Sequence, residues 1–195
     1  MIAKSFTYYP YLHLCLPTSR QGFHLYFCMF ISQLNCRIGP RNVTHPLLSL
    51  SIENQAQMQI LARQIAASLS AGDVVLLDGP LAAGKTFLVR EIVIALGGMD
   101  DEISSPTYTI ANIYDCPAFQ VLHVDAWRLH NAGEFHDLGL EEICEQGLAL
   151  VEWGSKVQEA FDMPLQINIS LQGDTRKIDF LGEAARWRSL AGGIV

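Results

Sequence analysis

The feature that most constrains this chain is the stretch DGPLAAGKTF, residues 78–87. Gly79 is followed by four residues and then by Gly84-Lys85-Thr86, which matches the pattern G-x-x-x-x-G-K-[ST] at every required position. In such a loop the backbone N–H groups point at phosphate oxygens, the lysine reaches the β- and γ-phosphates, and the hydroxyl residue ligates Mg²⁺. The stretch therefore predicts a phosphate-binding loop.

The residues on either side of the loop give it the expected context. The apolar run at 73–78 reads as a buried strand, and Gly97-Gly98 is a stop signal for a helix that begins after the loop. Four apolar residues of this helix recur at helical spacing: Leu88, Ile92, Ala95 and Leu96. The alternative is a chance match in an ordinary turn, but the strand–loop–helix order favours phosphate binding because the helix N-terminus attracts anions.

Further strands and helices alternate along the chain. The apolar patterns predict a helix over 55–70, a hairpin around Gly173-Asp174, and strands over 47–52, 121–124 and 148–151. Such alternation is typical of an α/β domain. We therefore predict a P-loop NTPase fold with a mostly parallel central sheet flanked by helices and a C-terminal β-hairpin.

Residues 1–46 differ in composition from the remainder, which we take as one P-loop domain over 47–195. The first acidic residue is Glu53, so all 20 acidic residues lie after the N-terminal stretch, and the net charge is −7. An acidic domain is a poor match for direct nucleic-acid binding but suits a basic protein partner. We interpret 1–46 as an atypical extension from a mis-called start. The alternatives are a targeting (transit) segment or an ordered functional element.

The five cysteines are odd in number and fit no zinc-binding spacing, so free thiols in a reducing compartment are the favoured interpretation. No stretch has the roughly 20 consecutive apolar residues that a membrane-spanning helix needs. We predict a cytoplasmic protein without a membrane partner, or an organellar one if the extension is a true transit peptide.

Two acidic residues follow apolar runs that read as strands. Asp125 comes after VLHV and Glu152 after LALV. Ligands of parallel sheets bind at the carboxyl ends of the strands, so both carboxylates are expected beside the loop, one near Mg²⁺ and one near the attacking water. Either acid alone reads as a solvated strand end, whereas the pair favours function. His123 shares the side-chain direction of Asp125, and we interpret it as a packing residue or as support for the site.

The motifs together resemble the TsaE (YjeE) family, small P-loop ATPases needed for the threonylcarbamoyl modification of adenosine 37 of tRNA. The resemblance is carried by the loop, SPTYT, HVDAWRL and LVEWGSK in this order and spacing, and it covers roughly residues 47–182. It implies an ATPase that needs ATP and Mg²⁺, is weak alone, and acts on two protein partners, TsaD and TsaB. Contact with tRNA is expected only through that complex.

The resemblance also implies roles for individual residues. Asp125 and Lys85 are implied as catalytic, Thr86 and Glu152 as magnesium ligands. A switch-like loop is implied at Ser105, Pro106, Thr107 and Tyr108. The implied nucleotide-binding residues, of which Asn54 and Arg176 rest on position alone, are Gly79, Pro80, Leu81, Ala82, Ala83, Gly84, Lys85, Thr86, Phe87, Asn54, Trp153 and Arg176.

The sequence departs from the family pattern within the loop itself. Pro80 stands where an acid is common and Ala82 where a glycine is common, and alanine is strained at positive φ. Two alternative functions stay open. A small-molecule kinase would need several arginines to clamp phosphates, and only Arg90 and Arg128 lie between the loop and Glu152. A non-hydrolysing nucleotide-binding scaffold is disfavoured by the paired acids.

Overall fold

The computed structural model describes residues 45–100, 103–106 and 108–194. The chain divides into two units, 1–39 and 40–195, and the described residues belong to the second. The predicted extension over 1–46 lies almost wholly outside the described residues, so the predicted boundary after residue 46 stays a prediction. Within the described residues no helix has the length and apolar character needed to cross a membrane.

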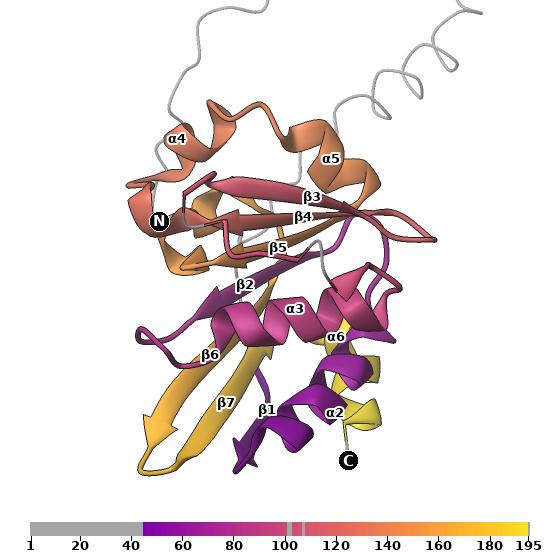
Figure 1. Cartoon of the computed structure of the whole chain (residues 1–195), viewed down its shortest axis with the longest axis vertical. Coiled ribbons are helices and arrows are strands. Elements are labelled where there is room, and N and C mark those ends of the chain that lie inside the picture. Colours follow the sequence, from indigo (N-terminus) through magenta and orange to yellow (C-terminus); the bar gives the residue numbers. More distant parts are fainter. Residues whose placement is uncertain (1–44, 101–102, 107, 195) are drawn as a thin grey trace, which may run out of the picture. The chain divides into compact units, whose positions relative to one another are not determined.

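A seven-stranded sheet forms the centre of this unit, in the order β1-β7-β6-β2-β5-β4-β3 (Figure 1). Its strands are β1 (His45–Ile52), β2 (Val74–Asp78), β3 (Ala111–Asp115), β4 (Gln120–Asp125), β5 (Leu148–Glu152), β6 (Leu165–Gln172) and β7 (Thr175–Gly182). The four central strands β4, β5, β2 and β6 pair in parallel, and β3 and β7 run against them. The predicted mostly parallel α/β architecture is confirmed.

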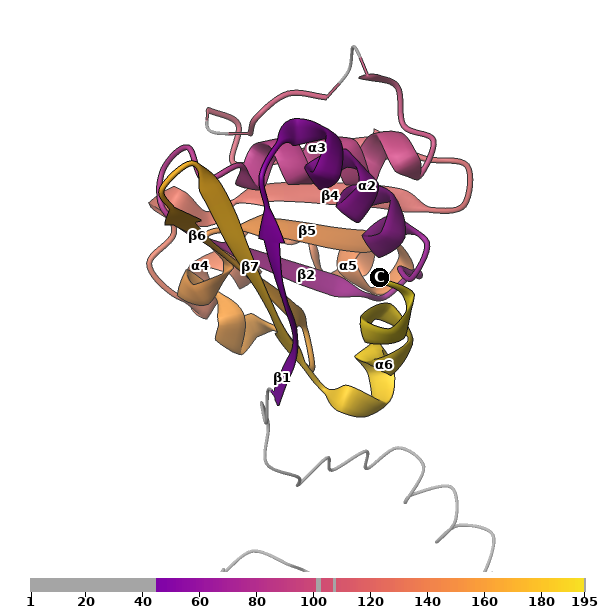
Figure 2. The same ribbon diagram turned by 90° about the horizontal axis from the view of Figure 1, so that it is seen from below.

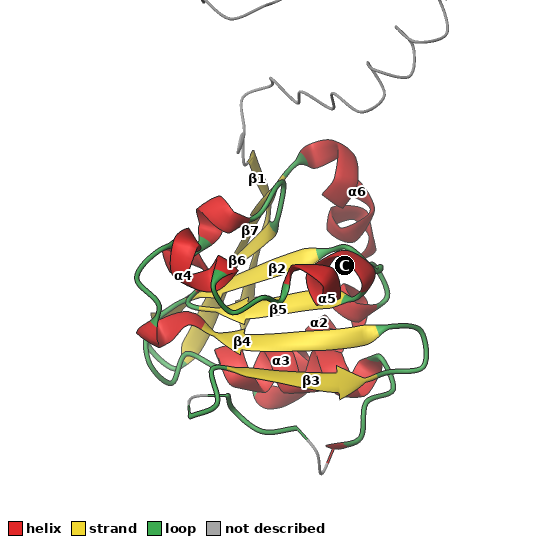
Figure 3. Ribbon diagram, turned by 90° about the horizontal axis from the view of Figure 1, so that it is seen from above, coloured by secondary structure: helices red, strands yellow, loops and turns green. Residues whose placement is uncertain are grey.

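Helices cover both faces of the sheet (Figures 1 and 3). The α-helices are α2 (Gln55–Ala66), α3 (Lys85–Ala95), α4 (Ala132–His136), α5 (Glu141–Gln146) and α6 (Ala184–Gly193). Three short 3₁₀ turns are η2 (Ala126–Arg128), η3 (Gly154–Lys156) and η4 (Gln158–Ala160). In Figure 1, α2, α3 and α6 lie below the sheet, while α4 and α5 lie above it.

Alternate residues of the central strands supply two separate apolar cores. Val75 and Leu77 of β2 pack in the core shared with α2, α3 and α6. Leu76 of the same strand packs in the other core, with Phe135 of α4 and Val157. This follows from the two-residue period of a strand whose two faces are both covered. His123 and Glu152 share the strand face of the residues packed against α3.

The predicted C-terminal hairpin is formed by β6 and β7, which pair from Gln166↔Leu181 to Gln172↔Thr175. The turn places Gly173 at φ 60, a left-handed conformation that glycine adopts at low cost. Strand β1 adds to the outer side of β7, antiparallel to it. Figure 2 shows how strongly β7 and β1 are twisted relative to β4 and β5, in line with the usual twist of sheets.

Two local expectations differ from the structure. Helix α2 ends at Ala66 rather than near residue 70, although Leu69 is still buried in the core, which is why the apolar period continued past the helix end. Ala95 is exposed, and the buried face of α3 is completed instead by Val89 and Val93. Both Val89 and Val93 neighbour Leu88 and Ile92 on the helix surface, so they widen the apolar face toward the sheet.

Candidate functional site

Strand register brings the two predicted acids to one edge of the sheet. Asp125 of β4 lies level with Glu152 of β5, and Glu152 lies level with Leu77 of β2. The phosphate-binding loop begins directly after Asp78, the last residue of β2. The carboxyl ends of three adjacent parallel strands therefore converge on the loop, as expected for a ligand site in such a sheet.

The loop backbone needs unusual conformations at several positions. Gly79 has φ 147, and a Cβ there would lie 2.3 Å from the carbonyl oxygen of Ile169 on β6. Gly84, which precedes the first residue of α3, has φ 109. Ala82 has φ 61, so this alanine occupies the left-handed region that glycine adopts more readily. The predicted strain at Ala82 is thus present in the structure.

Lys85 is buried in the loop and is held by backbone carbonyls. Its Nζ donates to the carbonyl oxygens of Gly79 at 2.8 Å and Pro80 at 3.0 Å. The same atom lies 3.7 Å from the centroid of the Trp153 ring, a cation–π contact. Burial lowers the pKa of the Lys85 ammonium, although nearby carboxylates, led by that of Glu152, act in the opposite direction.

Trp153 is positioned by a tight turn that follows β5. The residue itself is left-handed, with φ 58 and ψ 38. A Cβ on Gly154 would lie 2.5 Å from the Cβ of Leu76, so only glycine fits against β2 there. The Asp78 carboxylate then accepts from the backbone N and Oγ of Ser155, at 2.9 and 2.8 Å. The end of β2 thereby fixes the turn that places the indole over Lys85.

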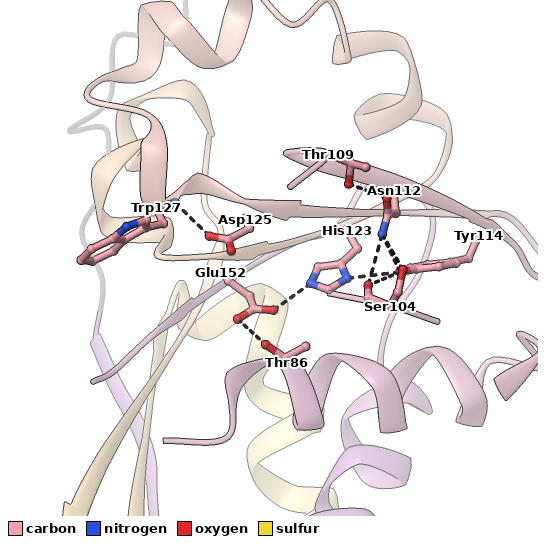
Figure 4. Close-up of polar contacts among 9 residues, drawn as sticks. All are labelled: Thr86, Ser104, Thr109, Asn112, Tyr114, His123, Asp125, Trp127 and Glu152. Carbon is pink, nitrogen blue, oxygen red and sulfur yellow. Dashed lines mark hydrogen bonds and ion pairs between the residues drawn. The ribbon is translucent and has the colours of Figure 1, made fainter. Parts of the chain in front are cut away.

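The Glu152 carboxylate is buried, and each of its oxygens has a partner (Figure 4). Thr86 Oγ1 lies 2.9 Å from Oε2 and donates to it. His123 Nε2 lies 2.9 Å from Oε1, and the histidine side chain is completely buried. The first turn of α3, the end of β5 and the middle of β4 thus meet at this one carboxylate.

Asp125 lies at the end of β4, in register with Glu152 on the neighbouring strand β5. Its Oδ1 accepts from the backbone N of Trp127 at 3.0 Å, which caps the short turn η2 (Figure 4). Its own backbone N donates to the carbonyl oxygen of Ile110 at 2.9 Å. The side chain is largely buried. Asp125 therefore joins the sheet edge to the segment that precedes β3.

A cavity of about 220 Å³ opens over the loop. Every residue that lines it belongs to the predicted site: Leu81, Ala82, Gly84, Lys85, Thr86, Phe87, Asp125, Glu152 and Trp153. The structure therefore brings the loop, both acids and the tryptophan around a single space. Their roles toward a nucleotide stay predictions.

Two predicted nucleotide contacts, Asn54 and Arg176, make other hydrogen bonds in the structure. Asn54 caps α2, because its Oδ1 accepts from the backbone N of Gln57 at 3.0 Å. Arg176 Nε donates to the carbonyl oxygen of Ala83 at 3.0 Å. That bond ties the hairpin strand β7 to the loop through the Nε of Arg176.

The predicted switch segment is described only in part. Thr107 lies outside the described residues. Pro106 accepts, through its carbonyl oxygen, from the backbone N of Ile110 at 2.7 Å, and the Tyr108 side chain is 88% exposed. Ser105, Pro106 and Tyr108 are not among the described residues that line the cavity. A role in sensing phosphate stays a prediction.

Sequence reasoning missed several residues that organise the site. Asp78 and Ser155 lie within the quoted stretches DGPLAAGKTF and LVEWGSK, but no role was assigned to either, since their contact joins residues 77 positions apart. Tyr114 on β3 reaches toward His123, with its hydroxyl 3.5 Å from Nδ1. A signal for His123 did exist, because its two-residue spacing from Asp125 gives both side chains the same face of β4.

The donor set fits magnesium bound together with a nucleotide. Mg²⁺ prefers oxygen ligands and is commonly held by one or two carboxylates, water and substrate phosphates rather than by an all-protein cage. Thr86 and Glu152 offer a hydroxyl and a carboxylate in direct contact at the cavity wall. Among the described residues no group of three or more His, Cys, Asp or Glu side chains could hold a metal ion by itself.

Comparisons with known proteins agree with this geometry. The family model "Threonylcarbamoyl adenosine biosynthesis protein TsaE" matches residues 52–178. A Rickettsia bellii protein named "tRNA threonylcarbamoyladenosine biosynthesis protein TsaE" is 34% identical over 128 residues, which cover 65% of this chain and 89% of that protein. The protein of the same name from Bacillus subtilis is 35% identical over 140 residues, covering 70% and 87%.

A solved structure is similar over the same region. The crystal structure of YdiB from Bacillus subtilis superposes with a TM-score of 0.63 at 29% sequence identity. It covers 78% of this chain and 96% of the YdiB chain. The family match spans the loop, both strand-end acids and the sheet that positions them. The chain therefore belongs to the TsaE family, the threonylcarbamoyl adenosine biosynthesis proteins.

Proposed function

We propose that this protein is a magnesium-dependent ATPase that serves the threonylcarbamoyl modification of adenosine 37 of tRNA by acting on a TsaD–TsaB complex. The observation that supports this most is the single cavity whose wall combines Lys85 and Thr86 of the loop with the carboxylates of Asp125 and Glu152. Phosphate-binding and metal-binding groups thus meet an extra acid. A loop that only bound phosphate would not need that acid.

The loop and Lys85 would bind the ATP phosphates. Lys85 now donates to two carbonyl oxygens of its own loop, and these bonds would be exchanged for bonds to phosphate oxygens. That exchange replaces two neutral carbonyl acceptors of the buried ammonium by anionic ones. The backbone N–H groups at the start of α3 would support the same phosphates.

Thr86 and Glu152 would hold magnesium. The Thr86 hydroxyl donates its proton to Glu152, which leaves the lone pairs of Oγ1 for the metal ion. The Glu152 carboxylate would bind the same ion. Magnesium, when bound, supplies positive charge next to the phosphate oxygens. Asp125 lies level with Glu152 one strand away and would orient the attacking water.

The partner assignment rests on the family and on charge. The acidic composition suits a basic protein surface better than direct tRNA binding. We therefore expect contact with tRNA only through TsaD and TsaB, and we place the protein in the cytoplasm.

The test is ATP hydrolysis by the purified protein, alone and with TsaD and TsaB, using Lys85→Ala as the control. Slow turnover alone, an increase with the partners and loss of turnover in the variant would support the proposal. Nucleotide binding without turnover in either setting would favour a non-hydrolysing scaffold, for which the left-handed Ala82 is the supporting observation. Transfer of phosphate to a metabolite would instead favour a kinase.

We also propose that the ATPase domain needs none of the residues before β1. Because β1 begins at His45 and pairs with β7 from that residue on, the truncation should remove residues 1–44 and leave the strand intact. Nucleotide affinity within about twofold of the full chain is the expected result. A folded truncation that has lost nucleotide binding would contradict the proposed domain boundary.

A further inference from the structure

A series of polar contacts runs from the Glu152 carboxylate through His123 and Tyr114, which do not line the cavity (Figure 4). His123 Nε2 contacts Glu152 Oε1 at 2.9 Å, and His123 Nδ1 lies 3.5 Å from the Tyr114 hydroxyl. That hydroxyl donates to the carbonyl oxygen of Ser104 at 2.9 Å. The contacts run through β5, β4 and β3 to the segment that follows α3, and they cross the interior of the protein.

The two middle residues of this series of contacts are shielded from water. His123 is 0% exposed and Tyr114 is 5% exposed. Polar groups buried to this extent are costly unless they are bonded, so their contacts are retained in the folded state. A carboxylate only accepts hydrogen bonds, so the His123 Nε2–H donates to Glu152 and fixes one of its oxygens. The other oxygen is left to Thr86 and the cavity.

The series of contacts branches at the Tyr114 hydroxyl, its end farthest from Glu152. Asn112 Nδ2 lies within 3.3 Å of that hydroxyl and donates to the Ser104 carbonyl oxygen at 3.1 Å. Asn112 Oδ1 also accepts from Thr109 Oγ1 at 2.8 Å. A tyrosine hydroxyl has one proton, and two acceptors, Ser104 O and His123 Nδ1, face it. The shorter bond holds the Ser104 end of the segment in the present arrangement.

A second contact joins the same segment to the other acid. The carbonyl oxygen of Ile110 accepts from the backbone N of Asp125 at 2.9 Å. Ile110 has φ 72, a strained conformation for a β-branched residue. Both candidate acids are therefore linked to the segment between α3 and β3, one through side chains and one through backbone.

We propose that His123 is a positioning residue that holds the Glu152 carboxylate for magnesium, and that Tyr114 couples the position of His123 to the Ser104 end of the segment before β3. This inference rests on the proposed function and goes beyond it, because it assigns a task to two residues that do not line the cavity. When Glu152 shifts to meet the metal ion, the imidazole follows. The Tyr114 proton then moves between its two acceptors, and the segment's anchor at Ser104 is strengthened or released.

The test compares three variants with the wild type in two measurements. The first measurement is ADP affinity by calorimetry with Mg²⁺ and with EDTA, which gives the magnesium enhancement of binding. The second is hydrogen exchange of a peptide spanning Ser104 to Ile110 under the same two conditions. The variants are His123→Leu, His123→Gln and Tyr114→Phe. The matched control is His130→Gln, which alters an exposed histidine–glutamate pair with Glu134 at 3.1 Å.

His123→Leu removes the donor to Glu152 and is expected to lower the magnesium enhancement about tenfold, the usual scale for residues that orient a metal ligand. His123→Gln keeps an N–H donor, so it should restore the enhancement to within about threefold of wild type. Tyr114→Phe should leave the enhancement nearly intact and abolish the magnesium-dependent change in exchange. His130→Gln should alter neither measurement. Far-UV circular dichroism and thermal unfolding report whether each variant is folded.

Wild-type magnesium enhancement in folded His123→Leu would overturn the positioning role. An unchanged exchange response in Tyr114→Phe, or no magnesium-dependent exchange in the wild type, would overturn the coupling. If the wild type binds no nucleotide, the proposed function fails and this inference fails with it. If the wild type binds nucleotide and the variants match it in both measurements, this inference fails and the proposed function stands.

Discussion

The two edges of the central sheet handle buried charge in opposite ways. At the carboxyl edge Lys85, Asp125 and Glu152 are all buried, and Lys85 donates to the carbonyl oxygens of its own loop. At the amino edge buried Asp73 accepts from the Arg186 guanidinium of α6 and from the backbone N of Ser70. The ion pair of the amino edge lies within the fold, whereas the buried charged groups of the carboxyl edge line a cavity.

Backbone conformation follows the same division. Of the four described non-glycine residues with positive φ, three adjoin the carboxyl edge: Ala82, Ile110 and Trp153. Strained residues cost free energy and persist where the surrounding structure fixes them. The comparison teaches that the amino edge and the apolar cores stabilise the fold, while the carboxyl edge combines strained backbone with buried charged groups that line the cavity. Four substitutions test this division, in order of expected effect.

Lys85→Met should have the largest effect, and on binding rather than on stability. Loss of the ammonium removes charge-assisted bonds to phosphate, so ATP affinity should fall at least about 100-fold, or about 2.7 kcal/mol. The unfolding temperature of the nucleotide-free variant should not fall below that of the wild type, because burial disfavours the charged form of Lys85. Calorimetry and a thermal melt check both parts, with surface Lys177→Met as control.

The pH dependence of this variant has a definite sign. The pKa of Lys85 is lowered by folding, so the unfolded state binds more protons in the window below its ordinary value of 10.5. Because of this group, the free energy of unfolding of the wild type increases as the pH rises through that window. Any stability advantage of Lys85→Met at pH 7 should shrink as the pH rises toward 10. An advantage that grows with pH would contradict the assignment.

Arg186→Met should act in the reverse manner, on stability rather than on binding. The substitution leaves the buried Asp73 carboxylate without its guanidinium partner, which should lower the free energy of unfolding by about 2 kcal/mol. ATP affinity should stay within twofold. Urea unfolding measures the loss, and Lys177→Met, which breaks a more exposed pair with Asp179, should cost less than about 1 kcal/mol. Equal losses would erase the contrast between the edges.

Asn54→Ala sharpens the comparison at a residue with two assignments. Loss of the N-cap of α2 should lower the free energy of unfolding by about 1 kcal/mol, as measured by urea unfolding. Asn54→Ser keeps a capping oxygen and should restore most of that loss. If both variants bind ATP as the wild type does, Asn54 belongs to the fold alone. A loss of affinity in both would support the predicted nucleotide contact.

Ala82→Gly should have the smallest effect. Glycine removes the cost of φ 61 but loses more chain entropy on folding, so a net gain of about 0.5 kcal/mol in stability is expected. ATP affinity should rise slightly, because the loop reaches its conformation with less strain. A thermal melt and calorimetry measure the two quantities. Lower stability in Ala82→Gly would show that the surroundings already compensate for the strain.

Local pattern was enough to predict the architecture, the loop and the two strand-end acids, whereas Trp153 of the cavity wall was implied by the family resemblance. The spacing of Gly79, Gly84, Lys85 and Thr86 fixed the loop, and the apolar runs located the strands that end at Asp125 and Glu152. Helix α6 was not predicted, because its apolar face is defined by packing against elements distant in the chain, among them β1 and α2. Asn54 and Arg176 were predicted as nucleotide contacts from their positions. The hydrogen bonds by which Asn54 caps α2 and Arg176 braces the loop were not predicted.

By itself the sequence determined the phosphate-binding loop, the α/β class and the two strand-end acids, because each depends on residues close together in the chain. The tertiary structure alone decided how distant side chains meet. Ser155 is clamped by Asp78, 77 positions away, and Thr86 reaches Glu152 across 66 positions. His123 and Tyr114 gained their place behind Glu152 only when β3, β4 and β5 paired, since strand register sets which side chains face one another.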